Sequence, residues 1–386
     1  MNTMNCDVVI IGGGPVGLAL ALALRSSKLD VRVLEARSPE GAASDPRALA
    51  LSYGSRLLLE RLGVWRNIEQ VSGIRTIHVS QKGALGRAIL RAPELNVSAL
   101  GYVLPYPALH RALQQALQES NIRYLTGAAV SQLESLADGA YIHYQHDDKE
   151  YALTARIAVV ADGGKLLEES HPFEVTEYGQ SAIITHVTCQ HPKSDTAFER
   201  FTAQGPVALL PYMDGYELVW TADHDKAQQM LQWDDATFLT QLHEHFGDRV
   251  GNFISVGKRS CFPLRLRRAP DTTLPHTVLL GNAAQTLHPV AGQGFNMGVR
   301  DAWELAQVIL GSPPEALGAE AMLADYRKSR RLDRNAGIRF TDGLVRMFSN
   351  DLPLLSGGRA ASLSMLDCLP FAKKFVAKRM MFGANG

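Results

Sequence analysis

The feature that most constrains this chain is a glycine-rich turn between an apolar run and a predicted helix. Residues 8–11 form a continuous apolar run of strand length, and Gly12-x-Gly14-x-x-Gly17 follows directly. Residues 18–25 are rich in alanine and leucine, which predicts a helix. In such a unit the first glycine permits a tight turn, the second lets the backbone approach a pyrophosphate, and the third allows close helix packing.

A second apolar strand is predicted at residues 31–34, and it ends at Glu35. An acid about 20 residues after the turn accepts a hydrogen bond from the ribose of a bound dinucleotide. The helix that begins at the turn directs the positive end of its dipole at the phosphates. These features favour dinucleotide binding over a glycine turn in an ordinary α/β sheet, but they do not distinguish a nicotinamide from a flavin.

A second glycine-rich turn, within residues 281–298, favours a flavin. It lies between a predicted buried strand at residues 277–280 and a predicted helix at residues 301–310. Gly292 and Gly294 let backbone N–H groups face a ligand directly. A helix that begins nearby presents the positive end of its dipole to a negative group, such as a reduced, anionic flavin ring.

Composition and charge exclude several classes of protein. The 386 residues include 39 basic and 39 acidic side chains, so the formal net charge is zero, and 46% of the residues are hydrophobic. A disordered chain has fewer apolar residues, and a nucleic-acid-binding protein usually has a basic excess. The length corresponds to two or three domains of roughly 100–200 residues each.

The cysteines and the N-terminus favour a cytoplasmic protein. Cys6, Cys189, Cys261 and Cys368 are far apart and form no C-x-x-C pair, so neither a zinc site nor a disulfide framework is predicted. Asp7 interrupts the N-terminus before any signal-peptide core. The apolar stretches are shorter than the roughly 20 residues of a membrane span. We expect a soluble protein, or one peripheral on the inner face of a membrane.

The remaining pattern predicts an α/β protein with a β-rich middle section and a helical end. A polar loop is expected at residues 38–46. Helices are expected at residues 48–62, 107–120, 234–246 and 301–310. Strands are expected at residues 75–103, up to residue 151, at residues 155–160 and within residues 173–263. The chain after residue 310 is expected to be helical, with interruptions near Pro353 and Pro370.

Three ordered motifs resemble those of the class A flavoprotein monooxygenases, which have the para-hydroxybenzoate hydroxylase fold. The motifs are Gly12 to Gly17, Asp162-Gly163 and Gly281 to Gly294. The chain departs from the family after Asp162-Gly163, where the usual serine and arginine are absent. Tyr106 stands where many relatives have arginine or glutamine, so that contact with the cofactor is not assigned.

Two other departures narrow the resemblance. Asn282 and Gln285 replace the family's usual aspartate and histidine, and this stretch looks like the 2-octaprenyl-6-methoxyphenol hydroxylase family of ubiquinone biosynthesis. Residues 198–202 and 205–211 resemble the same family. Asn282 can hydrogen-bond a flavin hydroxyl only as a neutral group. We expect weaker FAD retention, because a charge-assisted hydrogen bond is roughly twice as strong as a neutral one.

The resemblance implies an α/β fold with a Rossmann-like FAD-binding domain, an inserted β-sheet substrate domain and a C-terminal helical segment. The FAD-binding domain is expected at residues 1–75, 104–172 and 264–345. The substrate domain is expected at residues 76–103 and 173–263. The helical segment is expected at residues 346–386.

The resemblance also implies a reaction. NAD(P)H reduces FAD, the reduced flavin reacts with O₂ to give a C4a-hydroperoxide, and oxygen passes to the aromatic ring of a polyprenylated phenol in ubiquinone biosynthesis. One alternative is a hydroxylase of another ring position or of a soluble phenol. Alternatives of another class are a non-catalytic prenyl-binding protein of the same fold and a prenyl-lipid reductase that does not use O₂.

The resemblance assigns residues to the cofactor and to the flavin ring. Glu35 is expected at the adenosine ribose, Arg47 at FAD, and Asn282 at the ribityl or ribose hydroxyls. The other expected cofactor residues are Gly12, Gly14, Gly17, Asp162, Gly163, Gly281, Gly292, Gly294, Phe295 and Asn296. The surroundings of the flavin ring are expected to include Pro289, Gly292, Gln293 and Gly294. No acid or base side chain is assigned, no metal cluster is predicted, and His288 is interpreted as structural.

A prenylated phenol needs an apolar tunnel, for which Leu209, Tyr212 and Trp220 are candidates together with Val207, Leu210 and Phe262. The alternative is that they form the ordinary core of a sheet. Residues 371–382 contain four basic and no acidic residues, with aromatic residues and methionines between them. This segment is expected either to lie on an anionic membrane or to pack on a neighbouring helix or subunit. A homo-oligomer, or a complex with other enzymes of ubiquinone biosynthesis, is a further expectation.

Overall fold

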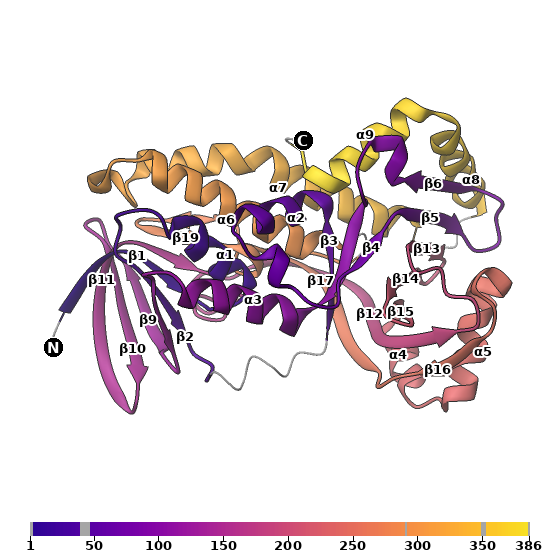
Figure 1. The fold of residues 1–386 in the computed structure, drawn as a ribbon, viewed down its shortest axis with the longest axis horizontal. Helices are drawn as coiled ribbons and strands as arrows, with labels where there is room; N and C mark the ends of the chain where they lie inside the picture. The colour runs from indigo at the N-terminus through magenta and orange to yellow at the C-terminus, as the bar shows by residue number, and fades with distance from the viewer. Residues whose placement is uncertain (1–2, 39–46, 290–291, 349–352, 385–386) are drawn as a thin grey trace.

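Figure 1 shows the computed structural model, which describes residues 3–38, 47–289, 292–348 and 353–384. The strands form three sheets. The first sheet and the N-terminus lie at one end of the elongated molecule, and the strands and helices of residues 174–256 lie at the other. The predicted loop at residues 38–46 falls almost entirely outside the described residues.

The first sheet contains the glycine-rich turn. Its parallel strands run in the order β19 (Thr277–Leu279), β11 (Lys149–Val160), β1 (Thr3–Ile11), β2 (Val31–Glu35) and β8 (Arg123–Thr126). The antiparallel strands β18 (Thr273–Leu274), β10 (Ala140–His146) and β9 (Ala129–Ser135) extend it. Continuous apolar runs such as the end of β1 suit a parallel sheet that is covered on both faces. The predicted α/β class and the strand–turn–helix unit are confirmed.

Three helices cover one face of this sheet: α1 (Pro15–Leu24), α3 (Tyr106–Gln118) and α6 (Gln293–Gly311). The contact between α1 and α6 is very close. A Cβ atom at Gly298 would lie 2.9 Å from Val16 Cγ2, so only glycine fits there without displacing a neighbour. The predicted helix at residues 301–310 is therefore the second half of a longer helix whose first turns contain glycines.

The second sheet is antiparallel except at one pair of strands. Its order is β20 (Gln285–Thr286), β17 (Ser260–Arg268), β12 (Glu174–Cys189), β15 (Gly215–Asp223), β14 (Gly205–Tyr212), β13 (Thr196–Thr202), β5 (Thr76–Gln81) and β6 (Arg87–Arg91), with β16 (Phe253–Val256) beside β12. Parallel pairing of β5 with β13 brings two distant segments of the chain into one sheet. The domain limits expected from the sequence stay a prediction.

Helices α4 (His224–Leu231) and α5 (Asp235–Phe246) pack on one face of the second sheet through an apolar core. The predicted helix at residues 234–246 corresponds to α5, whereas α4 was not predicted. The C-terminal region is helical as expected, with α7 (Glu320–Phe348), α8 (Pro353–Cys368) and α9 (Pro370–Phe382). Short 3₁₀ helices lie at η2 (Trp65–Asn67), η3 (Ala92–Leu95), η4 (Gly247–Val250), η5 (Gly281–Ala283) and η7 (Pro314–Ala316).

The prediction of one helix at residues 48–62 is wrong. The segment forms β3 (Ala48–Ser52) followed by α2 (Tyr53–Arg61), and the Ser52 hydroxyl caps α2 by accepting from Ser55 N at 3.2 Å. Strand β3 pairs along its whole length with β7 (Gly101–Pro105), which also pairs with β4 (Ser72–Ile74) in the third sheet. Pairing with a strand about 50 residues away overrides the local helix propensity.

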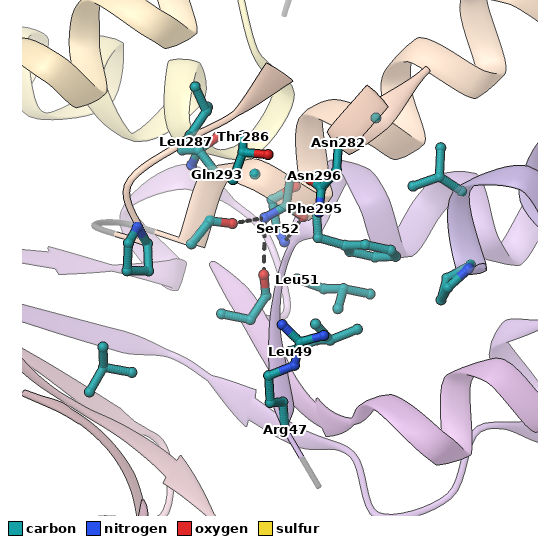
Figure 2. Close-up of a pocket in the computed structure, with 18 of the residues that line it drawn as sticks. Arg47, Leu49, Leu51, Ser52, Asn282, Thr286, Leu287, Gln293, Phe295 and Asn296 are labelled. Atoms are coloured by element: carbon teal, nitrogen blue, oxygen red, sulfur yellow. Dashed lines mark hydrogen bonds between the residues drawn. The ribbon is translucent and has the colours of Figure 1, made fainter. Parts of the chain in front are cut away.

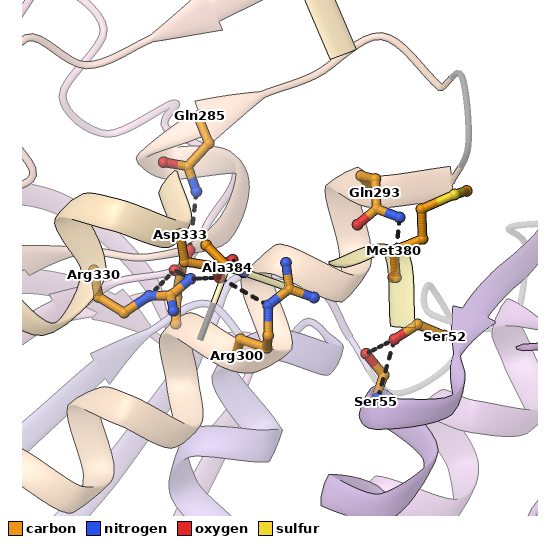
Figure 3. A network of polar contacts seen from close by, with 10 residues as sticks. Ser52, Ser55, Gln285, Gln293, Arg300, Arg330, Asp333, Met380 and Ala384 are labelled. Atoms are coloured by element: carbon orange, nitrogen blue, oxygen red, sulfur yellow. Dashed lines mark hydrogen bonds and ion pairs between the residues drawn. The ribbon is translucent and has the colours of Figure 1, made fainter. Parts of the chain in front are cut away.

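A buried ionic network fixes α7 and the C-terminus to α6 (Figure 3). Arg330 on α7 donates to Asp301 of α6 at 2.6 Å and to Asp333 at 2.8 Å, and all three side chains are at most 6% exposed. Asp333 also accepts from Arg300 and from the backbone N–H of Ala384. Such a network needs every partner, because an uncompensated buried charge is costly.

We predict that Arg330→Met lowers the free energy of unfolding by about 3–5 kcal/mol, because it leaves the Asp301 carboxylate buried without its cation. Chemical denaturation measures the loss. The matched control is Glu320→Gln, which removes the surface pair with Arg327 and should cost less than about 1 kcal/mol. Equal losses in the two variants would contradict the role of the network.

Candidate active site

One cavity of about 1230 Å³ lies where the three sheets and the C-terminal helices meet. The carboxyl ends of β1, β2 and β11 form one end of it, and β3 with the start of α6 forms a wall. One face of the second sheet and residues of α7, α8 and α9 line the rest. Figure 2 shows the part of this cavity around the start of α6, with Leu49, Leu51 and Ser52 of β3 beside it and Arg47 farther along the same segment.

The glycine-rich turn lies at the end where β1 stops. Gly12 has a φ of +110°, and a Cβ atom there would lie 2.6 Å from the carbonyl group of Ala161. A Cβ atom at Gly17 would lie 2.1 Å from the carbonyl oxygen of Gly12, so Gly17 serves close packing. Gly14 faces open space and lines the cavity together with Gly12. The N-terminus of α1 has no acidic residue in its first turn and is thus free to receive an anion.

Glu35 lines the same end and is anchored to the protein. Its carboxylate accepts from the backbone N–H of Gly13 at 2.6 Å and from Arg37 through the backbone N–H at 2.9 Å and Nε at 2.8 Å. Burial acts to raise the pKa of Glu35, but the hydrogen bonds from Arg37 and Gly13 hold it below its ordinary value. Glu35 is therefore ionised at neutral pH. Arg37 also lines the cavity, and sequence reasoning missed it.

A residue behind the glycine-rich turn was also missed. The Nε2 atom of buried His110 lies 2.8 Å from the carbonyl oxygen of Gly13, and its ring stacks on Tyr106. Burial lowers the pKa of His110, so the ring is neutral at neutral pH. The neutral His110 ring supports the turn through this contact with Gly13 and adds no charge there. In the sequence, His110 follows Tyr106 by one helical turn, and this spacing alone does not indicate a contact with the glycine-rich turn.

Asp162 and Gly163 line the cavity beside the turn. The Asp162 carboxylate accepts from the backbone N–H groups of Gly164 at 2.7 Å and Leu166 at 2.8 Å, so it shapes its own loop. Arg267 supports that loop by donating to the carbonyl oxygens of Gly163 and Gly164. Sequence reasoning missed Arg267, because it lies on β17, about 100 residues from the loop it supports.

Asn296 clamps the start of α6 to β3. Its side-chain oxygen accepts from Ser52 N at 2.8 Å, and its amide nitrogen donates to the carbonyl oxygens of Ala50 at 3.0 Å and Gly292 at 2.6 Å (Figure 2). Gly292 has a φ of +60°, and a Cβ atom there would lie 3.0 Å from Ala50 Cβ. Asn296 lines the cavity, but its polar atoms are used within the protein.

The other predicted residues of the second turn also reach the cavity. Gly281, Asn282, Pro289, Gln293, Gly294 and Phe295 all line it. Asn282 is exposed on η5, and Gln293 donates to the carbonyl oxygen of Met380 at 3.4 Å, which connects the turn to α9. Arg47 lines the opposite side, with its guanidinium 6.0 Å from the centre of the Tyr106 ring. The residues expected at this end therefore line one cavity, and their contacts with the cofactor stay a prediction.

Gln285 and His288 are buried away from the cavity. Gln285 donates to Asp301 at 2.9 Å and accepts from Arg334 at 2.9 Å, so it belongs to the polar network between α6 and α7. Burial lowers the pKa of His288 to about 4, and its ring lies edge-on to Tyr178. A histidine that stays neutral inside the protein agrees with the structural interpretation.

The substrate residues expected from the sequence need correction. Leu209 and Trp220 point to the opposite face of the sheet, into the core beneath α4 and α5, and Tyr212 packs against Ile74 and Val103. Strand side chains alternate between faces, so the cavity receives their neighbours. The residues of β13, β14 and β15 that line it are Ala197, Phe198, Glu199, Phe201, Pro206, Ala208, Leu210, Val219 and Thr221. Val207 and Phe262 likewise do not line it, whereas Leu210 does.

The C-terminal helices close the apolar part of the cavity. Phe340 and Leu344 of α7, Leu363 and Leu366 of α8, and Val376, Ala377, Met380 and Met381 of α9 contribute lining. Helix α8 is held to β6 because Asp367 accepts from Ile89 N at 3.0 Å. Helix α9 packs its inner side on the protein through Ala377 and Met381.

Comparisons with known proteins agree with this geometry. The family described as FAD binding domain matches residues 5–341. Ubiquinone hydroxylase UbiL of Rhodospirillum rubrum is 31% identical over 97% of this chain and 89% of its own length. The 3-demethoxyubiquinol 3-hydroxylase of Escherichia coli is 29% identical over 92% of this chain and 93% of its own.

Solved structures place the fold. The p-nitrophenol 4-monooxygenase PnpA from Pseudomonas putida superposes with a TM-score of 0.80 at 19% identity, and the match covers 100% of both chains. This confirms the predicted para-hydroxybenzoate hydroxylase type of fold. The chain therefore belongs to the family described as FAD binding domain, and it is a flavoprotein monooxygenase of that family.

Proposed function

We propose that this protein hydroxylates the aromatic ring of a polyprenylated phenol in ubiquinone biosynthesis, with FAD as cofactor and NAD(P)H and O₂ as co-substrates. The observation that carries the proposal is a single cavity with a polar, glycine-lined end and a long apolar end. Relatives named for hydroxylation of ubiquinone precursors support the substrate class.

The residues at the polar end fit FAD. Gly12 and Gly14 leave the backbone open at the N-terminus of α1, which suits a pyrophosphate. Glu35 and Arg37 would hold the adenosine ribose, and Asn282 would hold the linker to the flavin. The flavin ring would lie beside Gly292, Gly294 and Phe295, where the N-terminus of α6 also lacks an acid in its first turn.

Bound FAD would supply hydride acceptance from NAD(P)H and the activation of O₂. The chain's own residues provide position and exclude water. The Asn296 clamp fixes the backbone around Gly292, and the N-terminus of α6 favours negative charge on the group beside it. The apolar lining keeps solvent away from the place where oxygen is transferred.

The apolar end is suited to a prenyl tail. Its lining combines the inner face of the second sheet with apolar side chains of α7, α8 and α9. The volume of about 1230 Å³ exceeds the roughly 300–1,000 Å³ of ordinary small-ligand sites. The cavity therefore exceeds an ordinary small-ligand site, and its apolar lining, rather than its volume, favours a lipid-like substrate over a soluble phenol.

The outer side of the C-terminal helices suits a membrane surface. Phe371 is 84% exposed and Phe375 is 54% exposed on α9, and Met365 and Leu369 are exposed nearby. Lys374 shares this helix, whose other side lines the cavity. None of the described helices is both long and apolar enough to cross a membrane. We propose that this face rests on an anionic lipid surface from which the substrate enters.

We predict that the purified, FAD-loaded protein consumes O₂ and NAD(P)H only when a short-chain prenylated phenol is present, and that it forms a ring-hydroxylated product. Oxygen uptake with mass spectrometry of the product is the measurement. Turnover without O₂ would indicate the reductase instead. Substrate binding without flavin absorbance would indicate a prenyl-binding protein.

Asn282→Asp should retain FAD more strongly than the wild type, because a carboxylate makes a charge-assisted hydrogen bond to a flavin hydroxyl. FAD occupancy after gel filtration and the rate of FAD loss on dilution measure retention. We expect roughly a tenfold slower loss, because a hydrogen bond to a charged group is stronger than a neutral one by roughly 1 kcal/mol. Unchanged or faster loss would place Asn282 away from the cofactor.

Phe371→Ser combined with Phe375→Ser should weaken binding to vesicles of anionic phospholipid by roughly tenfold or more, since burying one such side chain contributes about 1.5–3 kcal/mol. Co-sedimentation measures binding. Point variants are preferable to deletion of α9, because α9 lines the cavity. The control is Leu136→Ser, which removes an exposed apolar side chain elsewhere. Equal vesicle binding by the wild type and both variants would exclude the membrane face.

A further inference from the structure

The ionisable groups that line the cavity are distributed unevenly. Those at the nucleotide end are Glu35, Arg37, Arg47, Tyr106, Asp162 and Lys165. Among the described lining residues from the second sheet and from α7, α8 and α9, Glu199 alone is ionisable. A carboxyl group in an otherwise apolar substrate region is costly to maintain, so its position calls for a chemical role.

Strand register shows what surrounds Glu199. It pairs with Val79 of β5 on one side and with Ala208 of β14 on the other. Its neighbours on the same face of β13 are Ala197 and Phe201. Within the part of the chain that the structure describes, no hydrogen bond or ion pair reaches its carboxyl group. The Glu199 side chain is half-buried and faces the cavity, and its carboxyl group lacks the partners that usually accompany a carboxylate away from bulk water.

Burial raises the pKa of Glu199 to about 7, and no charged group contributes to the shift. Neighbouring titratable groups are satisfied elsewhere: Tyr178 donates to Asp342, which pairs with Arg346. On β13 itself, Arg200 points to the other face and donates to Ser80 at 3.1 Å. Among the described residues that line the apolar part of the cavity, Glu199 is thus the one whose carboxyl group can exchange a proton near neutral pH.

We propose that Glu199 accepts the proton of the aromatic hydroxyl group when the substrate is hydroxylated. This inference rests on the proposed function, because it takes a phenol as the ligand. The O–H bond of the substrate breaks, its electron pair stays on the ring oxygen, and the proton bonds to a carboxylate oxygen of Glu199. The phenolate then donates electron density to the ring carbon that receives oxygen. The proton leaves Glu199 for solvent as the product departs.

The surroundings make Glu199 a better proton acceptor than an exposed glutamate. A phenol has an ordinary pKa of about 10, and a base works best when its own pKa lies near the working pH. The apolar neighbours Val79 and Ala208 bring the carboxyl group into that range. No described side chain hydrogen-bonds the carboxyl oxygens of Glu199, so they are open to the hydroxyl group of a substrate.

Glu199→Gln tests the proposal, since it keeps the shape of the side chain and removes the ionisable group. We expect kcat at neutral pH to fall by about 10²–10⁴-fold, with little change in KM. In the wild type kcat should rise with pH up to about 7. In the variant kcat should keep rising toward the ordinary phenol pKa of about 10, because hydroxide then removes the phenol proton. Glu244→Gln, an exposed site on α5, is the matched control and should behave like the wild type.

A second measurement does not depend on turnover. Binding of a nitrophenol that is already ionised, at a pH about one unit above the pKa of Glu199, should take up close to one proton in the wild type and none in Glu199→Gln. Calorimetry in buffers of different ionisation heat measures the uptake. Proton uptake by a wild type that does not hydroxylate prenylated phenols would refute the proposed function, but it would still show that Glu199 exchanges a proton with a bound phenol. Absence of uptake, with kcat either unchanged or lowered equally at every pH, would overturn the role of Glu199.

Discussion

The close contact between α1 and α6 is the constraint on which the active site depends. Gly298 lets α6 approach Val16 of α1, and Gly281 fits against the same valine. Both helices can then begin at one cavity, so two positive helix ends face the same space. A side chain at Gly298 would separate the helices and move apart the two ends that are proposed to hold the pyrophosphate and the flavin ring.

Several contacts transmit this arrangement to the rest of the molecule. Asn296 ties the start of α6 to β3, and Gln293 ties it to α9. The network of Arg330, Asp301 and Asp333 holds α7 and the C-terminus on the other side of α6. The C-terminal helices can therefore line the apolar part of the cavity with their inner side while their outer aromatic residues remain exposed. The zero net charge of the chain does not indicate that the cavity has a polar end and an apolar end.

Local spacing predicted the unit of strand, glycine turn and helix correctly, because such a unit is defined within about 20 residues. Contacts between distant segments were not predictable. The strand at Ala48–Ser52 exists because β7 pairs with it. Leu209 and Trp220 are apolar on a strand, but the face they occupy is set by α4 and α5. The sequence placed Glu199 only within the family-like stretch at residues 198–202, and strand pairing then set it between Val79 and Ala208.

The central claim is that nucleotide and substrate share one cavity, with the aromatic ring between the start of α6 and the second sheet. The most direct test is a crystal structure with FAD and a prenylated phenol bound. We predict the pyrophosphate at Gly12 and Gly14, the flavin ring beside Gly292 and Phe295, and the substrate hydroxyl group within hydrogen-bond distance of Glu199. A substrate bound outside this cavity, or with its hydroxyl group turned away from β13, would contradict it.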